Sequence, residues 1–125
     1  VETRAHGFFD GALETRADGS MRVLMLGRSP LSNRYRLFRY DAATGAPDGT
    51  FGGPGGFVDI SVGADAQPRS LVKGPSGAGY YVLGLAGTRT AIAHVSDAGA
   101  VDLDFGTRRI SAEWKRESFP RLNGI

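Results

Sequence analysis

Apolar runs along this chain are short, and each is bounded by Gly, Pro, Asn or Asp. Within the runs, β-branched, aromatic and leucine side chains either alternate with polar ones or follow one another directly, which is typical of half-buried and fully buried strands. The periodicity of an amphipathic helix is missing. The pattern predicts strands over residues 6–9, 13–16, 21–27, 34–41, 57–62, 69–73, 80–86, 90–96 and 108–114.

Turn and strand chemistry supports these predictions. Asp18 and Gly19 lie between two of the runs, and an Asp-Gly pair readily supplies the positive φ angles of a tight hairpin turn. Arg22, Arg36 and Arg39 alternate with apolar residues, so we expect them on the polar faces of their strands.

The order of runs and turns repeats after about 54 positions, the spacing between Phe51-Gly52 and Phe105-Gly106. Three pairs of segments correspond: 48–52 with 102–106, 37–39 with 92–94, and 23–26 with 82–85. In this alignment His94 takes the place of Arg39. Self-similarity at such a period is typical of repeat proteins, in which each unit buries its apolar face against a neighbour.

Four short antiparallel strands per copy predict a β-propeller blade. We therefore expect an all-β fold of antiparallel four-stranded repeats, a partial β-propeller with about two blades and one strand of a third. The chain 1–125 is predicted to be one domain. Repeat 1 spans about 6–52, repeat 2 spans about 53–106, and the start of a third repeat with a tail spans 107–125.

The residues 37–41 and 48–52, with a weaker echo over 94–106, are similar to the delta-60 repeat, a bacterial module. The resemblance covers roughly 10–106, and its most specific parts are Arg39-Tyr40-Asp41 and Phe51-Gly52. The chain departs from the family at 74–79, where the family has an Asp-Gly-Lys turn, and at Val95, where it has Tyr. The resemblance implies a propeller-like β array on secreted or cell-surface proteins, and it brings no catalytic residue.

Composition narrows the classes of function. The chain has no Cys, so a disulfide framework and a Cys-based zinc site are excluded. Lys and Arg total 15 against 13 Asp and Glu, which supports no nucleic-acid partner. No apolar run approaches the length of a membrane span. Because the chain starts at Val1 and not at Met, we expect a processed or excised product.

No acid, base and nucleophile set is predicted. Ser76 lies in a segment that misses the G-x-S-x-G pattern because Ala78 replaces its last Gly, and a hairpin turn explains the segment. His94 is interpreted as a polar residue on a strand face. No cofactor is expected.

The candidate ligand-binding residues are basic and aromatic, and they gather near the C-terminal end: Trp114, Arg108, Arg109 and Arg116. Asp102 and Asp104 alternate, so both carboxylates could point to one side and bind calcium. Thr50 replaces the second Asp in the other copy, so no metal site is predicted there.

The leading interpretation is a non-catalytic structural or protein-interaction β-propeller module of a bacterial secreted, periplasmic or cell-surface protein. Two alternatives stay open: a lectin-like propeller that binds carbohydrate, and a fragment of a larger enzyme whose catalytic site lies elsewhere. Closed propellers typically have about four to eight blades. We therefore expect other polypeptide chains, or identical copies, to complete the assembly, and we favour other polypeptide chains.

Overall fold

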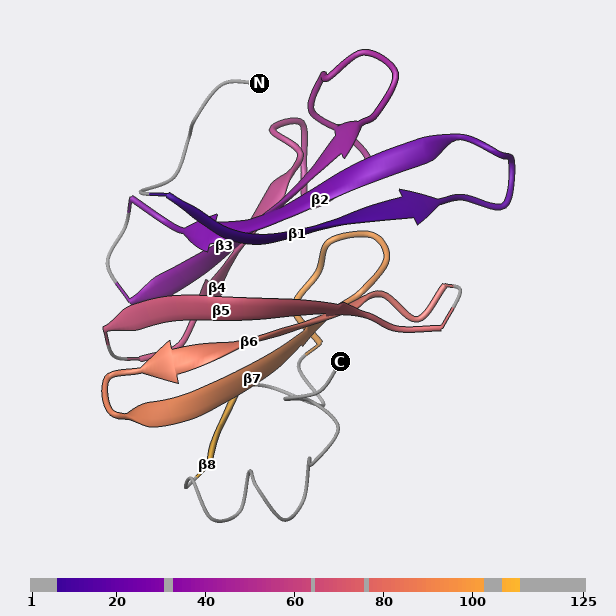
Figure 1. Ribbon diagram of the computed structural model, residues 1–125. Coiled ribbons are helices and arrows are strands. Elements are labelled where there is room, and N and C mark those ends of the chain that lie inside the picture. The colour runs from indigo at the N-terminus through magenta and orange to yellow at the C-terminus, as the bar shows by residue number, and fades with distance from the viewer. Residues whose placement is uncertain (1–6, 31–32, 64, 76, 103–106, 111–125) are drawn as a thin grey trace.

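The computed structural model describes residues 7–30, 33–63, 65–75, 77–102 and 107–110, and of the last segment only the backbone. The described residues form antiparallel strands and no helix, which confirms the all-β prediction. Two four-stranded sheets follow one another along the chain (Figure 1). Sheet 1 contains β1 (Phe8–Thr15), β2 (Met21–Arg28), β3 (Arg34–Asp41) and β4 (Phe57–Ser61), and sheet 2 contains β5 (Ala66–Lys73), β6 (Tyr80–Ala86), β7 (Arg89–Val95) and β8 (Thr107–Ile110), each in chain order.

The first hairpin forms as its turn residues predict. Gly19 has a φ of 87°, and the Asp18 carboxylate accepts hydrogen bonds from the backbone and the hydroxyl of Ser20. The prediction of two separate strands over 6–9 and 13–16 is wrong, because β1 runs unbroken through this region. A β-bulge between Phe8 and Asp10 absorbs the irregularity that the sequence shows as a break.

In each sheet the fourth strand comes from the segment that the 54-residue repeat assigns to the start of the next copy. β4 pairs with β3, and β8 pairs with β7, so β8 completes sheet 2 and the prediction of a lone strand of a third blade is wrong. The reason lies in the preceding loop, which folds back onto β3. The backbone of Arg39 is hydrogen-bonded there to Asp48 and to Gly56, which delivers the next strand to the free edge of β3.

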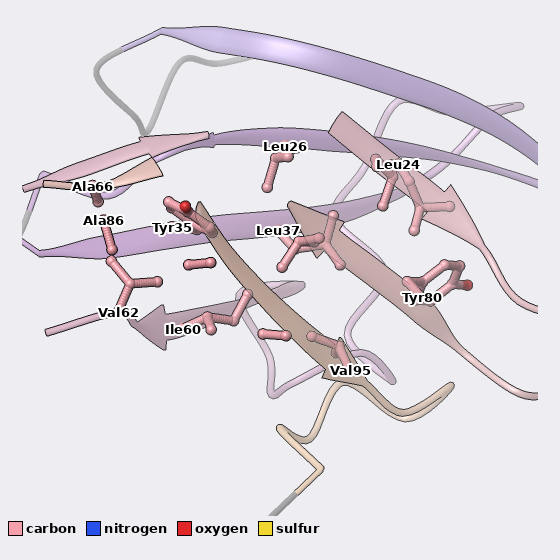
Figure 2. Packing of buried hydrophobic residues seen from close by; sticks show 14 of the residues in the cluster. Leu24, Leu26, Tyr35, Leu37, Ile60, Val62, Ala66, Tyr80, Ala86 and Val95 are labelled. Atoms are coloured by element: carbon pink, nitrogen blue, oxygen red, sulfur yellow. The ribbon is translucent and has the colours of Figure 1, made fainter. Parts of the chain in front are cut away.

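The core lies between the two sheets, which pack face to face. Figure 2 shows Leu24, Leu26 and Leu37 of sheet 1 facing Tyr80 and Val95 of sheet 2. Four apolar residues of the central strands, which from their strand positions could be expected in the core, lie instead toward the outer sides of the sheets. Val23 and Leu85 are half-buried, whereas Leu83 and Ile92 are buried but outside the cluster between the sheets.

The two sheets approach each other closely at Gly84 in β6. A Cβ atom there would lie 2.6 Å from the Tyr35 hydroxyl and would collide with the carbonyl oxygen of Gln67. The Tyr35 hydroxyl donates to the carbonyl of Leu85 at 2.8 Å and so links the sheets at this point. The absence of a side chain at Gly84 is therefore required for the stacking.

We expect Gly84→Ala to lower the free energy of unfolding by about 1–3 kcal/mol, as overpacking does in a closed core. Gly49→Ala is the matched control, since a Cβ there would meet its nearest neighbour at 3.8 Å, an ordinary contact. Denaturant titration of both variants measures the difference. Equal unfolding midpoints for the two would contradict the close packing around Gly84, against β5 and against Tyr35.

Candidate functional site

The two sheets have the same irregularity at the same place, which defines their equivalent residues. In sheet 1 the bulge follows Phe8, which lies opposite Gly27. In sheet 2 it follows Pro68, which lies opposite Gly84. Gly27 and Gly84 are therefore equivalent, and counting back along β2 and β6 makes Val23 equivalent to Tyr80.

The third strands confirm the predicted alignment of Arg39 with His94. The carbonyl of Arg39 accepts a hydrogen bond from the amide of Asp48, and the carbonyl of His94 accepts one from the amide of Asp102. The alignment of 23–26 with 82–85 is wrong by two positions, since Val23 is the counterpart of Tyr80. A shift of two residues leaves each side chain on the same face, so the apolar pattern could not reveal it.

We name the two faces of each sheet front and back. In sheet 1 the front presents Leu24, Leu26, Leu37 and Arg39, whose equivalents in sheet 2 are Tyr81, Leu83, Ile92 and His94. The back of sheet 1 presents Val23, Met25, Phe38 and Tyr40, whose equivalents are Tyr80, Val82, Ala93 and Val95. The inter-sheet cluster joins the front of sheet 1 to the back of sheet 2, so non-equivalent faces are in contact.

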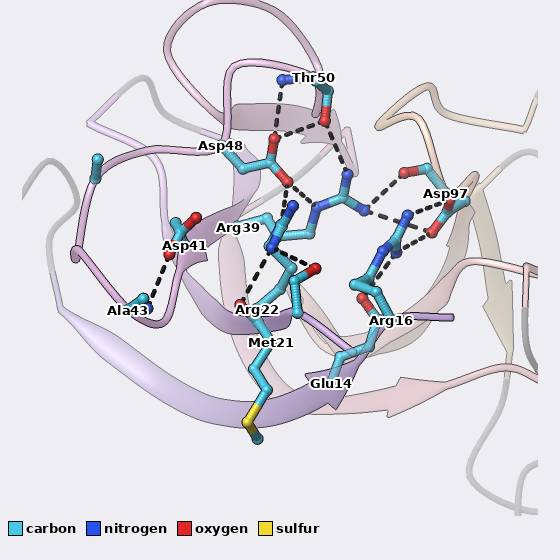
Figure 3. A network of polar contacts seen from close by, with 12 residues as sticks. Glu14, Arg16, Met21, Arg22, Arg39, Asp41, Ala43, Asp48, Thr50 and Asp97 are labelled. Carbon is cyan, nitrogen blue, oxygen red and sulfur yellow. Dashed lines mark hydrogen bonds and ion pairs between the residues drawn. The ribbon is translucent and has the colours of Figure 1, made fainter. Parts of the chain in front are cut away.

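The guanidinium of Arg39 is buried at this contact and bonds to both sheets (Figure 3). Arg39 is 2% exposed and Asp48 is 8% exposed, and Arg39 Nε donates to Asp48 Oδ2 at 2.9 Å. Arg39 Nη1 donates across to sheet 2, to the Tyr80 hydroxyl at 3.1 Å and to the Asp97 carbonyl at 2.8 Å. The guanidinium also lies 4.6 Å from the ring centroid of Phe51. Placing Arg39 on a solvated strand face was therefore wrong.

A second ion pair joins the sheets beside the first. Arg16 donates from Nη1 and Nη2 to the two carboxylate oxygens of Asp97, at 2.7 and 2.8 Å (Figure 3). The Tyr80 hydroxyl donates to Glu14 Oε1 at 2.6 Å. We name Glu14, Arg16, Arg39, Asp48, Tyr80 and Asp97 the clamp.

The clamp shifts the acidity of its members. Burial opposes ionisation of Asp48, but hydrogen bonds from Thr50, Arg22 and Arg39 outweigh it and hold the pKa of the carboxyl well below its usual range. The hydrogen bond from Arg16 lowers the pKa of Asp97. Burial, helped by the hydrogen bond to Glu14, raises the pKa of Tyr80 to about 12. Both carboxylates are therefore charged, and Tyr80 is a neutral donor, at neutral pH.

The counterpart of the Arg39–Asp48 pair in sheet 2 is a histidine–aspartate pair. His94 Nδ1 lies 2.8 Å from Asp102 Oδ2, and Nε2 lies 2.6 Å from the carbonyl oxygen of Ala78. The ring stacks on Tyr81, with 4.5 Å between centroids. Both ring nitrogens therefore contact acceptors of the second copy, and in these contacts neither reaches across to sheet 1.

The structure locates only part of the predicted site. Arg108 and Arg109 belong to β8, whose backbone alone is described, whereas Trp114, Arg116, Asp104 and Ser76 lie outside the described residues. Asp102, the other residue considered for calcium, contacts His94. Among the residues that the structure describes, no three His, Asp or Glu side chains gather as metal ligands would.

A pocket of about 400 Å³ opens beside the clamp, lined by Glu14, Arg16, Lys73 and Asp97 among others. Its described charges are already engaged: Arg16 pairs with both carboxylates, and Lys73 Nζ donates to the carbonyl of Leu13. The charged side chains that the structure describes in the pocket lining are therefore already paired.

The back of sheet 1 carries an aromatic layer. Phe8, Tyr40 and Phe57 surround Phe38, with ring centroids 5.5 to 5.8 Å apart. Exposed apolar side chains lie around it, with Leu13 53% and Phe9 44% exposed. The hydroxyl of Tyr40 is buried without a hydrogen-bond partner. An apolar face of this kind is typical of a contact surface.

No family model, curated protein or solved structure matches this chain. In the part of the chain that the structure describes, no helix is long and apolar enough to cross a membrane.

We expect Arg39→Ala to lower the free energy of unfolding by about 1–3 kcal/mol, because the buried Asp48 carboxylate then keeps only Arg22 as a cation and the Asp97 carbonyl loses its donor. Arg34→Ala is the matched control, since Arg34 is exposed at the start of β3 and such surface changes cost within about 0.5 kcal/mol. Denaturant titration distinguishes the two. Similar losses for both variants would contradict the structural role of the clamp.

Acid should unfold the protein through the same carboxylates. Asp48 and Asp97 have folded-state pKa values below those of the unfolded chain, so the unfolded state takes up protons first as the pH falls. Their contribution is complete above about pH 5 and is lost progressively below about pH 4. We expect the free energy of unfolding to drop between pH 5 and pH 3, and to drop less in Asp97→Asn. Equal stability at both pH values would refute this.

Proposed function

We propose that this chain is a non-catalytic structural and protein-interaction module, two successive units of a repeating β-sheet array. The observation that carries the proposal is the contact between the front of sheet 1 and the back of sheet 2. When a front face meets a back face, one back and one front remain unused at the two ends of the stack. Contacts of this kind can therefore continue into rings or filaments. A closed two-sheet sandwich with equivalent faces in contact would have no such ends.

The connections favour a propeller-like arrangement of the array. Each sheet is formed by strands in chain order, and the short segment between Ser61 and Ala66 links the fourth strand of sheet 1 to the first strand of sheet 2. That is the chain path expected of successive propeller blades. The similarity of 37–52 to the delta-60 repeat supports a bacterial secreted or cell-surface location.

The polar residues support a structural role. Arg39, Arg16, Asp48 and Asp97 are paired with one another between the sheets, where they fix the stacking. A catalytic group needs access to a substrate and a poised proton, and the buried ion pair of the clamp offers neither.

Joining two copies of the chain end to end tests the proposal. The front of sheet 2 in the first copy can then stack on the back of sheet 1 in the second, so we expect the tandem chain to resist denaturant more than the single chain. Met25→Glu in the second copy should remove the gain, whereas the same change in the first copy, where that face is terminal, should not. A tandem chain no more stable than the single one would sink the proposal.

A further inference from the structure

We infer that the back of sheet 1 binds the front of sheet 2 in a second copy of this chain, so that copies associate head to tail. The inference rests on the proposed function and names the partner. It extends a contact that the chain already makes within itself, since the two surfaces are equivalent to the pair that meets between the sheets.

The back of sheet 1 has the properties of an interface that awaits its partner. Val23, Met25 and Tyr40 occupy the positions of Tyr80, Val82 and Val95, which are fully buried between the sheets. In sheet 1, Val23 and Met25 stay partly exposed, whereas Tyr40 is 3% exposed. On the front of sheet 2, Tyr81, Leu85 and His94 stay partly exposed, whereas Leu83 and Ile92 are 8% and 4% exposed.

Two further observations mark this face. Leu13 and Met21 are exposed at its edge. Among the described residues, the Tyr40 hydroxyl is buried and lacks a hydrogen-bond partner. A buried polar group left in that state costs free energy, which a donor or acceptor on a docked sheet would recover.

The proposed contact lacks the clamp. His94 replaces Arg39 on the docking front, and Val23 replaces Tyr80 on the receiving back. The turns after β3 and β7 are closed by equivalent bonds, from Asp41 to Ala46 and from Ser96 to Ala100. The position of Asp97 is therefore taken by Ala42, which has no charge.

The consequence is an apolar association that is weaker than the contact within the chain. Its free energy comes from the area removed from water, without an ion pair that crosses the interface. We therefore expect association to depend on protein concentration and to change little with ionic strength, because salt screens charges and not apolar contacts.

Two complementary variants of the full chain test the geometry. Met25→Glu places a charge on the back of sheet 1, and Leu85→Glu places one on the front of sheet 2, both at partly exposed positions. By light scattering we expect the unchanged chain to exceed its 13.2 kDa monomer mass, and each variant to stay monomeric. An equimolar mixture should form a one-to-one dimer, because one variant keeps its front and the other its back.

Controls separate folding from binding. Ala17→Glu adds the same charge on the exposed turn of the first hairpin and should associate like the unchanged chain. Circular dichroism verifies that each variant is folded, and Leu13→Glu, at an exposed position of the same face, replaces Met25→Glu if that variant unfolds.

Two results would overturn the inference. A chain that stays monomeric at every concentration would exclude a second copy as the partner, while a stabilised tandem chain would still support the proposed function. Self-association of Leu85→Glu alone would show a back-to-back contact of equivalent faces instead of a head-to-tail one.

Discussion

The buried ion pair between Arg39 and Asp48 constrains how the two sheets stack. A charge removed from water is tolerated only where partners replace its hydration. Arg39 finds them in Asp48 of its own sheet and in Tyr80 and Asp97 of the other. Sliding or inverting sheet 2 would leave the guanidinium buried without Tyr80 and Asp97. Apolar contacts supply most of the free energy of packing but tolerate rearrangement, so the clamp selects one arrangement.

That arrangement gives the molecule a direction. Since the front of one sheet meets the back of the next, the two ends of the stack differ, and each is suited to the other kind of face. The two copies have also diverged in how they use the third strand. Arg39 reaches across to the neighbouring sheet, whereas His94 binds Asp102 and Ala78 of its own sheet. The guanidinium thus fixes the contact within the chain, whereas its histidine counterpart bonds only within its own copy in these contacts.

Much of the local structure followed from the sequence. The strands β3 and β6 have the predicted bounds, because alternation of apolar and polar residues reflects the alternation of side chains across a strand. The first hairpin followed from Asp18 and Gly19, whose preference for turn geometry is local. The equivalence of Arg39 and His94 also came from the sequence, since the segments around them repeat. Each of these depends on neighbouring residues only.

Tertiary structure decided the rest. The sequence showed a repeat but not where one sheet ends, because β4 joins sheet 1 through loop hydrogen bonds at Arg39 that no residue pattern encodes. Alternation assigned Arg39 to a strand face without showing which face would be covered, so its burial in the clamp was missed. The alignment of Val23 was wrong by two positions for the same reason, since a shift of two residues leaves each side chain on the same face of its strand. Sequence pattern determines the side of a strand on which a residue lies, and only the packing of distant strands determines what meets it there.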